Sequence, residues 1–212
     1  MKIYEYGNAD APLILIQPVD DHDMEGMENE IKAIREQAGT DLRLIAVKVG
    51  SWNRDLSPWP APAVFGYEDF GDGAAAFLEE ILKLCPPDGK TYILGGYSLA
   101  GLFSLWAASR TDRFAGIAAA SPSVWFPGFM EYMQDNPVLC SAVYLSLGDR
   151  EERTRNPVMA TVGSCIRKGH EILESQSIKC TLEWNPGNHF KEPDLRTAKA
   201  FAWVIRELKV LL

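Results

Sequence analysis

Six short runs of apolar residues, many of them branched, recur along this chain, and segments with helical spacing lie between most of them. The runs cover residues 13–17, 42–49, 92–95, 116–120, 142–147 and 180–184. Runs that are apolar at nearly every position are typical of strands buried on both faces of a sheet. We therefore predict an α/β fold, in which right-handed crossovers connect a mainly parallel sheet that has helices on both faces.

The segments between these runs carry helix signals. The first has apolar residues at helical spacing and ends at Gly39; they are Met27, Ile31, Ile34 and Ala38. We expect Asp72 to cap a second helix and residues 99–110 to form a helix that is buried nearly all round. A fourth helix is expected to begin at Asn156, and the last carries one apolar stripe, which comprises Leu195, Ala198, Ala202, Ile205 and Leu208.

The composition is that of a globular chain without repeats or linkers, so we predict a single domain over residues 1–212. Its 21 basic and 29 acidic side chains give a net charge of −8, which disfavours binding to nucleic acid. The longest apolar runs fall far short of the roughly 20 residues that cross a bilayer. Residues 1–5 also lack the cationic and apolar regions of a secretion signal, so we expect a cytoplasmic protein that binds no membrane.

The cysteines and the early acidic loop are the places where a metal could bind. Cysteines occur at four separated positions without a CxxC pair, and we expect all of them to be reduced packing residues: Cys85, Cys140, Cys165 and Cys180. The alternative for the loop 20–23 is metal coordination by its three aspartates and His22. Adjacent side chains in an extended loop diverge, so we predict no metal and no cofactor.

The strongest chemical signal lies in residues 92–103, which indicate a buried strand, a very tight turn and a buried helix. Ser98 stands between Gly96 and Gly101 in a GxSxxG pattern. A turn that holds a serine hydroxyl above a sheet needs small neighbours, because larger ones would collide with the strand and helix. We predict Ser98 as a nucleophile and the backbone N–H of Leu99 as an oxyanion donor. One alternative is a turn that only packs closely. The other is a turn that binds phosphate, which is disfavoured because the turn contains no Lys or Arg.

A serine nucleophile needs a base and an acid. His189, in the turn-rich loop before the last helix, is the predicted base, with His22 and His170 as alternatives. The acid should lie between serine and histidine in chain order, after the strand that ends at Gly148. The usual hydrolase turn places it three positions after a glycine, which selects Glu151. Asp149, nearer to the strand end, is the alternative.

The second oxyanion donor should come from the loop after the strand 13–17. The backbone N–H of Val19 or of Asp20 is the candidate, although the HG-type signature of many lipases and esterases is absent there.

These residues resemble the esterase D-like branch of the α/β-hydrolases, which includes S-formylglutathione hydrolases, acyl esterases and siderophore esterases. The resemblance rests on residues 54–59, 96–101, 120–125, 187–190 and 200–203. It implies a three-layer α/β-hydrolase fold and ester hydrolysis through an acyl-serine intermediate. The family is usually longer, so we expect a reduced N-terminus in which residues 1–6 are the remnant of the first antiparallel strands.

We predict a serine esterase that cleaves small-molecule carboxylic esters with short acyl chains, or thioesters. The predicted pocket residues are Ser121, Trp125, Trp59 and Tyr97. Only residues 126–139 separate this segment from the next strand, and two prolines and a glycine break them, so we expect an open cleft without a large lid. The alternatives are an acyltransferase of the same fold and a catalytically silent relative that binds a ligand or a partner.

Overall fold

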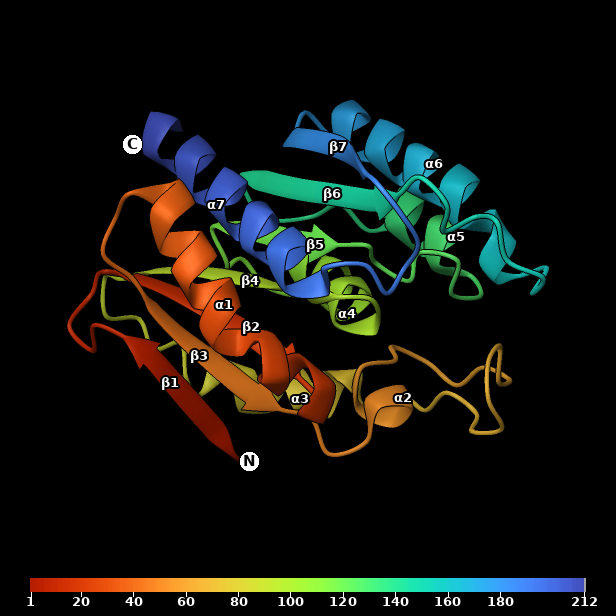
Figure 1. Cartoon of the computed structure of the whole chain (residues 1–212), viewed down its shortest axis with the longest axis horizontal. Helices are drawn as coiled ribbons and strands as arrows, with labels where there is room; N and C mark the ends of the chain where they lie inside the picture. Colours follow the sequence, from red (N-terminus) through yellow and green to blue (C-terminus); the bar gives the residue numbers. More distant parts are fainter. Residues whose placement is uncertain (212) are drawn as a thin grey trace.

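The computed structural model describes residues 1–211, and side chains as far as residue 208. Seven strands in this part of the chain form one sheet in the order β1-β3-β2-β4-β5-β6-β7 (Figure 1). Only β1 is antiparallel to its neighbour; all other pairs are parallel, as predicted. The strands are β1 (Ile3–Gly7), β2 (Leu13–Val19), β3 (Arg43–Lys48), β4 (Thr91–Tyr97), β5 (Gly116–Ala120), β6 (Ala142–Gly148) and β7 (Lys179–Asn185).

Helices cover both faces of this sheet and make three layers. On one face lie α1 (Asp21–Ala38) and α7 (Pro193–Leu211), which pack against each other (Figure 1). The opposite face carries α3 (Ala74–Leu82), α4 (Leu99–Ala108), α5 (Phe129–Asp135) and α6 (Val162–Ser175). Two short elements lie in the loops, α2 (Trp52–Asp55) and the 3₁₀ turn η1 (Met159–Thr161). The chain thus has the α/β-hydrolase type of architecture that the sequence predicts.

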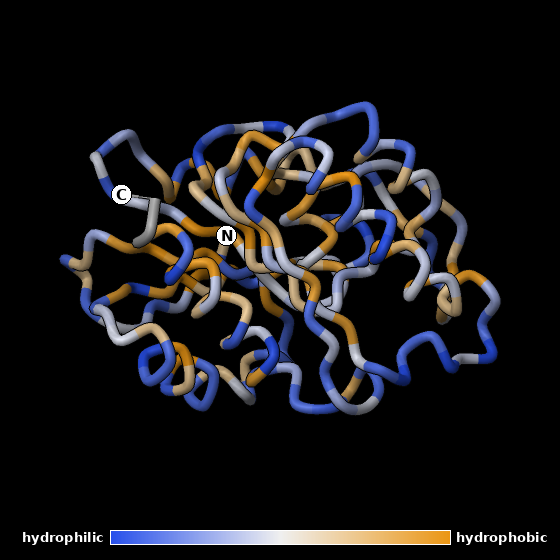
Figure 2. The backbone as a smooth tube through the Cα atoms, turned by 90° about the horizontal axis from the view of Figure 1, so that it is seen from above, coloured by the Kyte–Doolittle hydropathy of each residue, from blue (hydrophilic) through white to orange (hydrophobic). Residues whose placement is uncertain are grey.

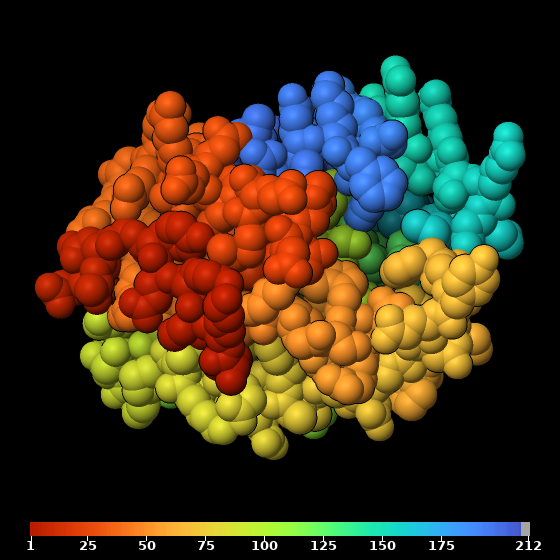
Figure 3. Space-filling model, turned by 60° about the horizontal axis from the view of Figure 1, so that its bottom comes forward, coloured from red at the N-terminus to blue at the C-terminus, as the bar shows by residue number. Residues whose placement is uncertain are grey.

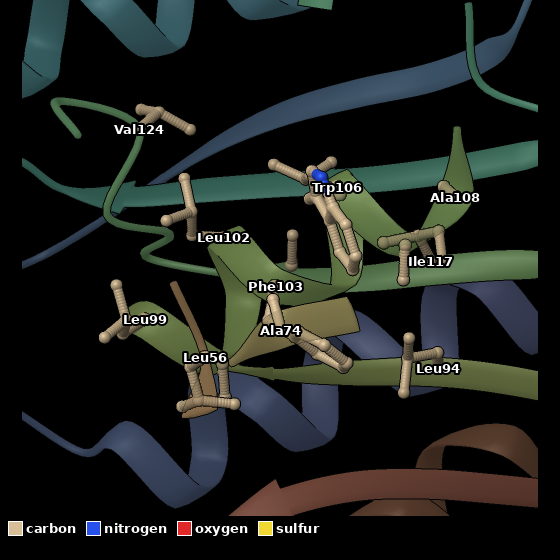
Figure 4. Packing of buried hydrophobic residues seen from close by; sticks show 14 of the residues in the cluster. Leu56, Ala74, Leu94, Leu99, Leu102, Phe103, Trp106, Ala108, Ile117 and Val124 are labelled. Atoms are coloured by element: carbon tan, nitrogen blue, oxygen red, sulfur yellow. The ribbon is translucent and has the colours of Figure 1, made fainter. Parts of the chain in front are cut away.

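Each face of the sheet has its own apolar core because successive strand residues point to opposite sides. In β2, Ile14 and Ile16 pack with α3 and α4, whereas Leu15 packs with α1 and α7. Apolar strands run through the interior of the molecule in Figure 2, and the hydrophilic segments lie outside. All ten residues of α4 are buried, as expected from its sequence, and Phe103 and Trp106 pack between neighbouring strands and α3 (Figure 4).

The ends of α1 and β1 agree with the sequence. Gly39 caps α1 with a left-handed φ of 56°, and its N–H donates to the carbonyl of Arg35. β1 is a single antiparallel edge strand on β3, in the place where a remnant of the longer N-terminal sheet was expected.

Three helix predictions need correction. Asp72 caps nothing: α3 begins after Gly73, where the N–H of Ala74 donates to the carbonyl of Ser57, so a loop backbone replaces the side-chain cap. Asn156 does not begin α6, which starts only at Val162; its Oδ1 instead accepts from the N–H groups of Val158 and Met159, in the turn that leads into η1. Leu195 is 39% exposed in the first turn of α7, and the four later residues of the stripe are buried.

The parallel strands bring their carboxyl ends to one edge of the sheet, where the loops after β2 to β7 gather. No helix in the described part of the chain is long and apolar enough to span a membrane.

Candidate active site

Ser98 lies in a strained turn between the central strand β4 and α4. Its φ of 57° and ψ of −119° are unusual for a residue with a side chain. Three backbone hydrogen bonds hold it there: its N–H donates to Ala120 at 3.1 Å, and its carbonyl accepts from Leu102 at 3.1 Å and Ser123 at 3.0 Å. The strain at Ser98 is therefore offset by hydrogen bonds to the end of β5, to the loop that follows β5 and to the first turn of α4.

The small residues beside Ser98 are required by this geometry. A Cβ at Gly96 would come within 2.6 Å of the Ala100 Cβ, and one at Gly101 would lie 3.1 Å from the carbonyl oxygen of Gly96. The first contact is too short for any side chain at Gly96, and the second is tight, which fits small residues on both sides of Ser98.

The imidazole of His189 stands between a hydroxyl and a carboxylate. Its Nε2 lies 3.0 Å from the Oγ of Ser98, and its Nδ1 lies 2.7 Å from Oε2 of Glu151. The other two histidines do not bond to the serine: His22 pairs with Glu25 at 3.8 Å, and His170 lies on α6 beside Glu174 at 3.6 Å. Of the three predicted bases, the structure brings only His189 to the serine.

Glu151, and not Asp149, meets the imidazole. The turn after β6 folds back at Gly148, whose carbonyl accepts from the N–H of Glu151 and whose N–H donates to Oε1 of Glu151 at 2.6 Å. The carboxylate of Asp149 instead accepts from the N–H of Gly187 at 2.8 Å. A side chain at position 148 would lie 2.4 Å from the Gly187 carbonyl oxygen, so the turn requires glycine.

The Glu151 side chain is almost fully buried, with 4% of its surface exposed. Besides the bond to the imidazole, its Oε1 accepts from Oγ of Ser121 at 2.8 Å and from Nη1 of Arg196 at 3.1 Å. Ser121, a predicted pocket residue, has a left-handed φ of 41°. It contacts the acid and also lines the cavity.

The pKa of nearby Tyr97 is raised to about 12, mainly by burial, so its phenol stays neutral.

The predicted oxyanion donors differ in their surroundings. Leu99 is the first residue of α4, where N–H groups have no partner within the helix. The N–H of Asp20 donates to Oδ2 of Asp23 at 3.1 Å within a capping box, so it is already engaged. Val19 is fully buried at the end of β2, in register with Lys48. Asp20 nevertheless lines a hollow together with Ser98.

An apolar cavity of about 290 Å³ opens at Ser98. Two of the predicted pocket residues, Ser121 and Trp125, line it. Trp59 does not: its Nε1 donates to the carbonyl of Pro127 at 2.9 Å, and its ring packs on those of Phe126, Phe129 and Tyr132. Pro122 and Ser123 line it too, as expected from the segment 121–125. The walls that were not predicted comprise Trp52, Phe65, Met159, Val162 and Phe190.

A second hollow of about 140 Å³ lies on the other side of the serine and histidine. Tyr97, the fourth predicted pocket residue, lines it together with Asp20, His22 and Asp23. Trp52 borders both hollows, and Phe190 is 82% exposed at their rim. In Figure 3 this region is recessed between the orange, yellow and blue segments.

No group of three or more His, Cys, Asp or Glu side chains within residues 1–208 is placed to hold a metal ion. In the same part of the chain all four cysteines are free, and burial raises the pKa of the Cys85 and Cys140 thiols to about 12.

Comparison of the sequence with models of known protein families and with curated proteins gives no match. Solved structures do resemble the chain. An IroE-like serine hydrolase from Shewanella oneidensis is 14% identical over 97% of this chain and 74% of its own, with a TM-score of 0.70. The siderophore hydrolase EstA from Aspergillus nidulans is 18% identical over 97% and 85%, with a TM-score of 0.64.

A third similar structure is FphF, a fluorophosphonate-binding serine hydrolase from Staphylococcus aureus. It is 13% identical over 93% of this chain and 87% of its own, with a TM-score of 0.60. At these identities the likeness concerns the fold, and it places the chain among structures of the α/β-hydrolase type.

Proposed function

We propose that this protein is a serine hydrolase that cleaves carboxylic esters through an acyl-serine intermediate. The observation that carries the proposal is the continuous chain from Ser98 Oγ through both ring nitrogens of His189 to Glu151. A hydroxyl, an imidazole and a buried carboxylate in this order activate an otherwise weak nucleophile.

In the first step, Oγ of Ser98 attacks the ester carbonyl carbon while Nε2 of His189 takes the hydroxyl proton. Glu151 stabilises the imidazolium and fixes its tautomer through Nδ1–H. The carbonyl oxygen becomes an oxyanion near the N–H of Leu99. When the C–O bond to the leaving alcohol breaks, the imidazolium returns the proton to that alcohol. Water then attacks the acyl-serine in the same way, and the acid and the free serine are released.

The apolar cavity is the proposed acyl site. Its volume of about 290 Å³ lies just below the usual range for ligand pockets, about 300–1,000 Å³, which favours a compact acyl group. Trp125, Phe65 and Val162 supply apolar walls. Thioesters with the same acyl group fit this chemistry, because the leaving group lies outside the cavity. Similar structures include siderophore hydrolases and a ferulic acid esterase, which fit a small-molecule ester as substrate. That the protein acts in the cytoplasm and forms a single domain remain predictions.

The test is hydrolysis of p-nitrophenyl esters from acetate to decanoate. We expect short-chain esters to be preferred and Ser98→Ala to lower kcat/KM by at least about 10³-fold. Ser164→Ala is the matched control, because this serine is exposed on α6 and bonds only a carbonyl in its own helix turn. A folded Ser98→Ala protein with wild-type turnover would refute the proposal.

Acyl transfer is the alternative outcome of the same intermediate, with an added alcohol in place of water. Product analysis with and without glycerol separates the two reactions. Free acid as the sole product supports hydrolysis, whereas a predominant glycerol ester would show that acyl transfer is the main reaction.

A further inference from the structure

One buried arginine contacts all three segments that carry the proposed catalytic side chains. Arg196 lies in the first turns of α7 with 4% of its surface exposed. Its Nη1 donates to Oε1 of Glu151 and to the hydroxyl oxygen of Tyr97, each at 3.1 Å, and its Nη2 donates to the carbonyl of Pro186 at 3.0 Å. Arginine is rarely this buried unless it is paired, so the contacts call for an explanation.

The three contacts reach three different segments of the chain. Glu151 follows β6, Tyr97 ends β4 directly before Ser98, and Pro186 follows β7 three residues before His189. The hydroxyl of Tyr97 in turn donates to the carbonyl of His189 at 2.7 Å. The guanidinium therefore joins the loop of the acid, the strand of the nucleophile and the loop of the base.

We propose that Arg196 is a positioning residue for the catalytic centre, which pairs with the Glu151 carboxylate and fixes it and His189 relative to Ser98. The proposal rests on the proposed function, since it assigns the arginine a role in that reaction. Arg196 touches no part of the substrate cavities and acts only through its neighbours.

The planar guanidinium suits this role better than an ammonium group would. Two of its nitrogens reach partners in three segments at once, whereas a lysine offers one nitrogen. On Glu151, Oε1 accepts from Gly148, Ser121 and Arg196, which leaves Oε2 to the imidazole. This division of the carboxylate keeps one oxygen directed at Nδ1 and compensates a buried charge with three donors.

The experiment compares Arg196→Met and Arg196→Lys with Arg206→Met, an exposed arginine on the same helix. With p-nitrophenyl acetate we expect Arg196→Met to lower kcat by about 10–100-fold with little change in KM, as for other residues that orient catalytic groups. Arg196→Lys should also lose kcat, because its single nitrogen cannot reach all three partners, and Arg206→Met should match wild type.

Wild-type kcat in folded Arg196→Met, or a rise in KM with kcat unchanged, would overturn the proposal. If Arg196→Met does not fold, Arg196→Lys decides: full kcat there would show that the fork is not needed. The NMR signal of the His189 Nδ1–H reports its hydrogen bond to Glu151 and needs no substrate. It separates failure of this inference from failure of the proposed function, since an inactive wild type whose signal is moved or lost in either Arg196 variant would refute only the latter.

Discussion

Replacing Glu151 with Gln tests which acid serves the imidazole. The substitution keeps the shape of the side chain and removes its charge, so the imidazolium formed during attack loses the partner that lies 2.7 Å from Nδ1. In other serine triads the same type of change lowers kcat by about 10⁴-fold, which corresponds to ~5.5 kcal/mol. We expect a loss between about 10³ and 10⁴-fold here, with KM little changed.

The same substitution should also destabilise the fold. Arg196 and Glu151 are each 4% exposed, so the variant leaves a buried guanidinium without its counter-charge. Breaking a buried pair on one side typically costs about 3–5 kcal/mol. The amide oxygen of Gln can still accept hydrogen bonds, so we expect ~3 kcal/mol, measured by urea unfolding.

Asp149→Asn is the matched control. The carboxylate of Asp149 is half-exposed, and the N–H of Gly187 donates to it. It should change kcat less than about twofold. The assay is steady-state hydrolysis of p-nitrophenyl acetate by folded protein. If Asp149→Asn loses more activity than Glu151→Gln, or if Glu151→Gln loses less than tenfold, the assignment of the acid is refuted.

Three further predictions concern packing, pH and the cavity. Gly95→Ala should destabilise the fold by about 1–3 kcal/mol, since the new Cβ would lie 2.7 Å from Ala118 and from the Phe201 ring. Gly169→Ala in α6 should instead stabilise the fold by about 0.5–1 kcal/mol, because its new Cβ makes only ordinary contacts. Urea unfolding measures both changes. Burial, and secondly the charge of Asp23, raises the pKa of Glu30 well above its ordinary value, so ionisation opposes folding and wild-type stability should fall as pH rises from about 5 to 8. Glu30→Gln should show a smaller fall, to which Asp23 still contributes because burial raises its pKa to about 6, and parallel pH curves would contradict the role of Glu30. Trp125→Ala should shift the preferred p-nitrophenyl ester to a longer chain by about two carbons, and an unchanged chain-length profile would exclude the acyl role of the cavity.

Much of the fold and the central side chains could be predicted because local rules decide them. The strands are apolar throughout, since both faces of a parallel sheet are covered. The turn at Ser98 needs small residues within five positions of one another, and Gly148 folds Glu151 back within four residues. Each of these signals lies within one short segment.

The rest depends on contacts between distant segments. Trp59 was expected in the cavity, but its indole faces Pro127, and no pattern around residue 59 indicates that partner. The backbone of Asp20 is engaged by Asp23 because α1 starts earlier than its apolar spacing suggests. Arg196 has the sequence context of a surface helix residue, and its buried partners come from the end of β4 and from the loops after β6 and β7.

The most direct test of the central claim is the site of covalent labelling by a fluorophosphonate, mapped by peptide mass spectrometry. We predict a single adduct on the peptide that contains Ser98, formed with loss of esterase activity, and its absence in His189→Ala protein that is folded. An adduct on another serine, or labelling of Ser98 at the wild-type rate without His189, would contradict the account.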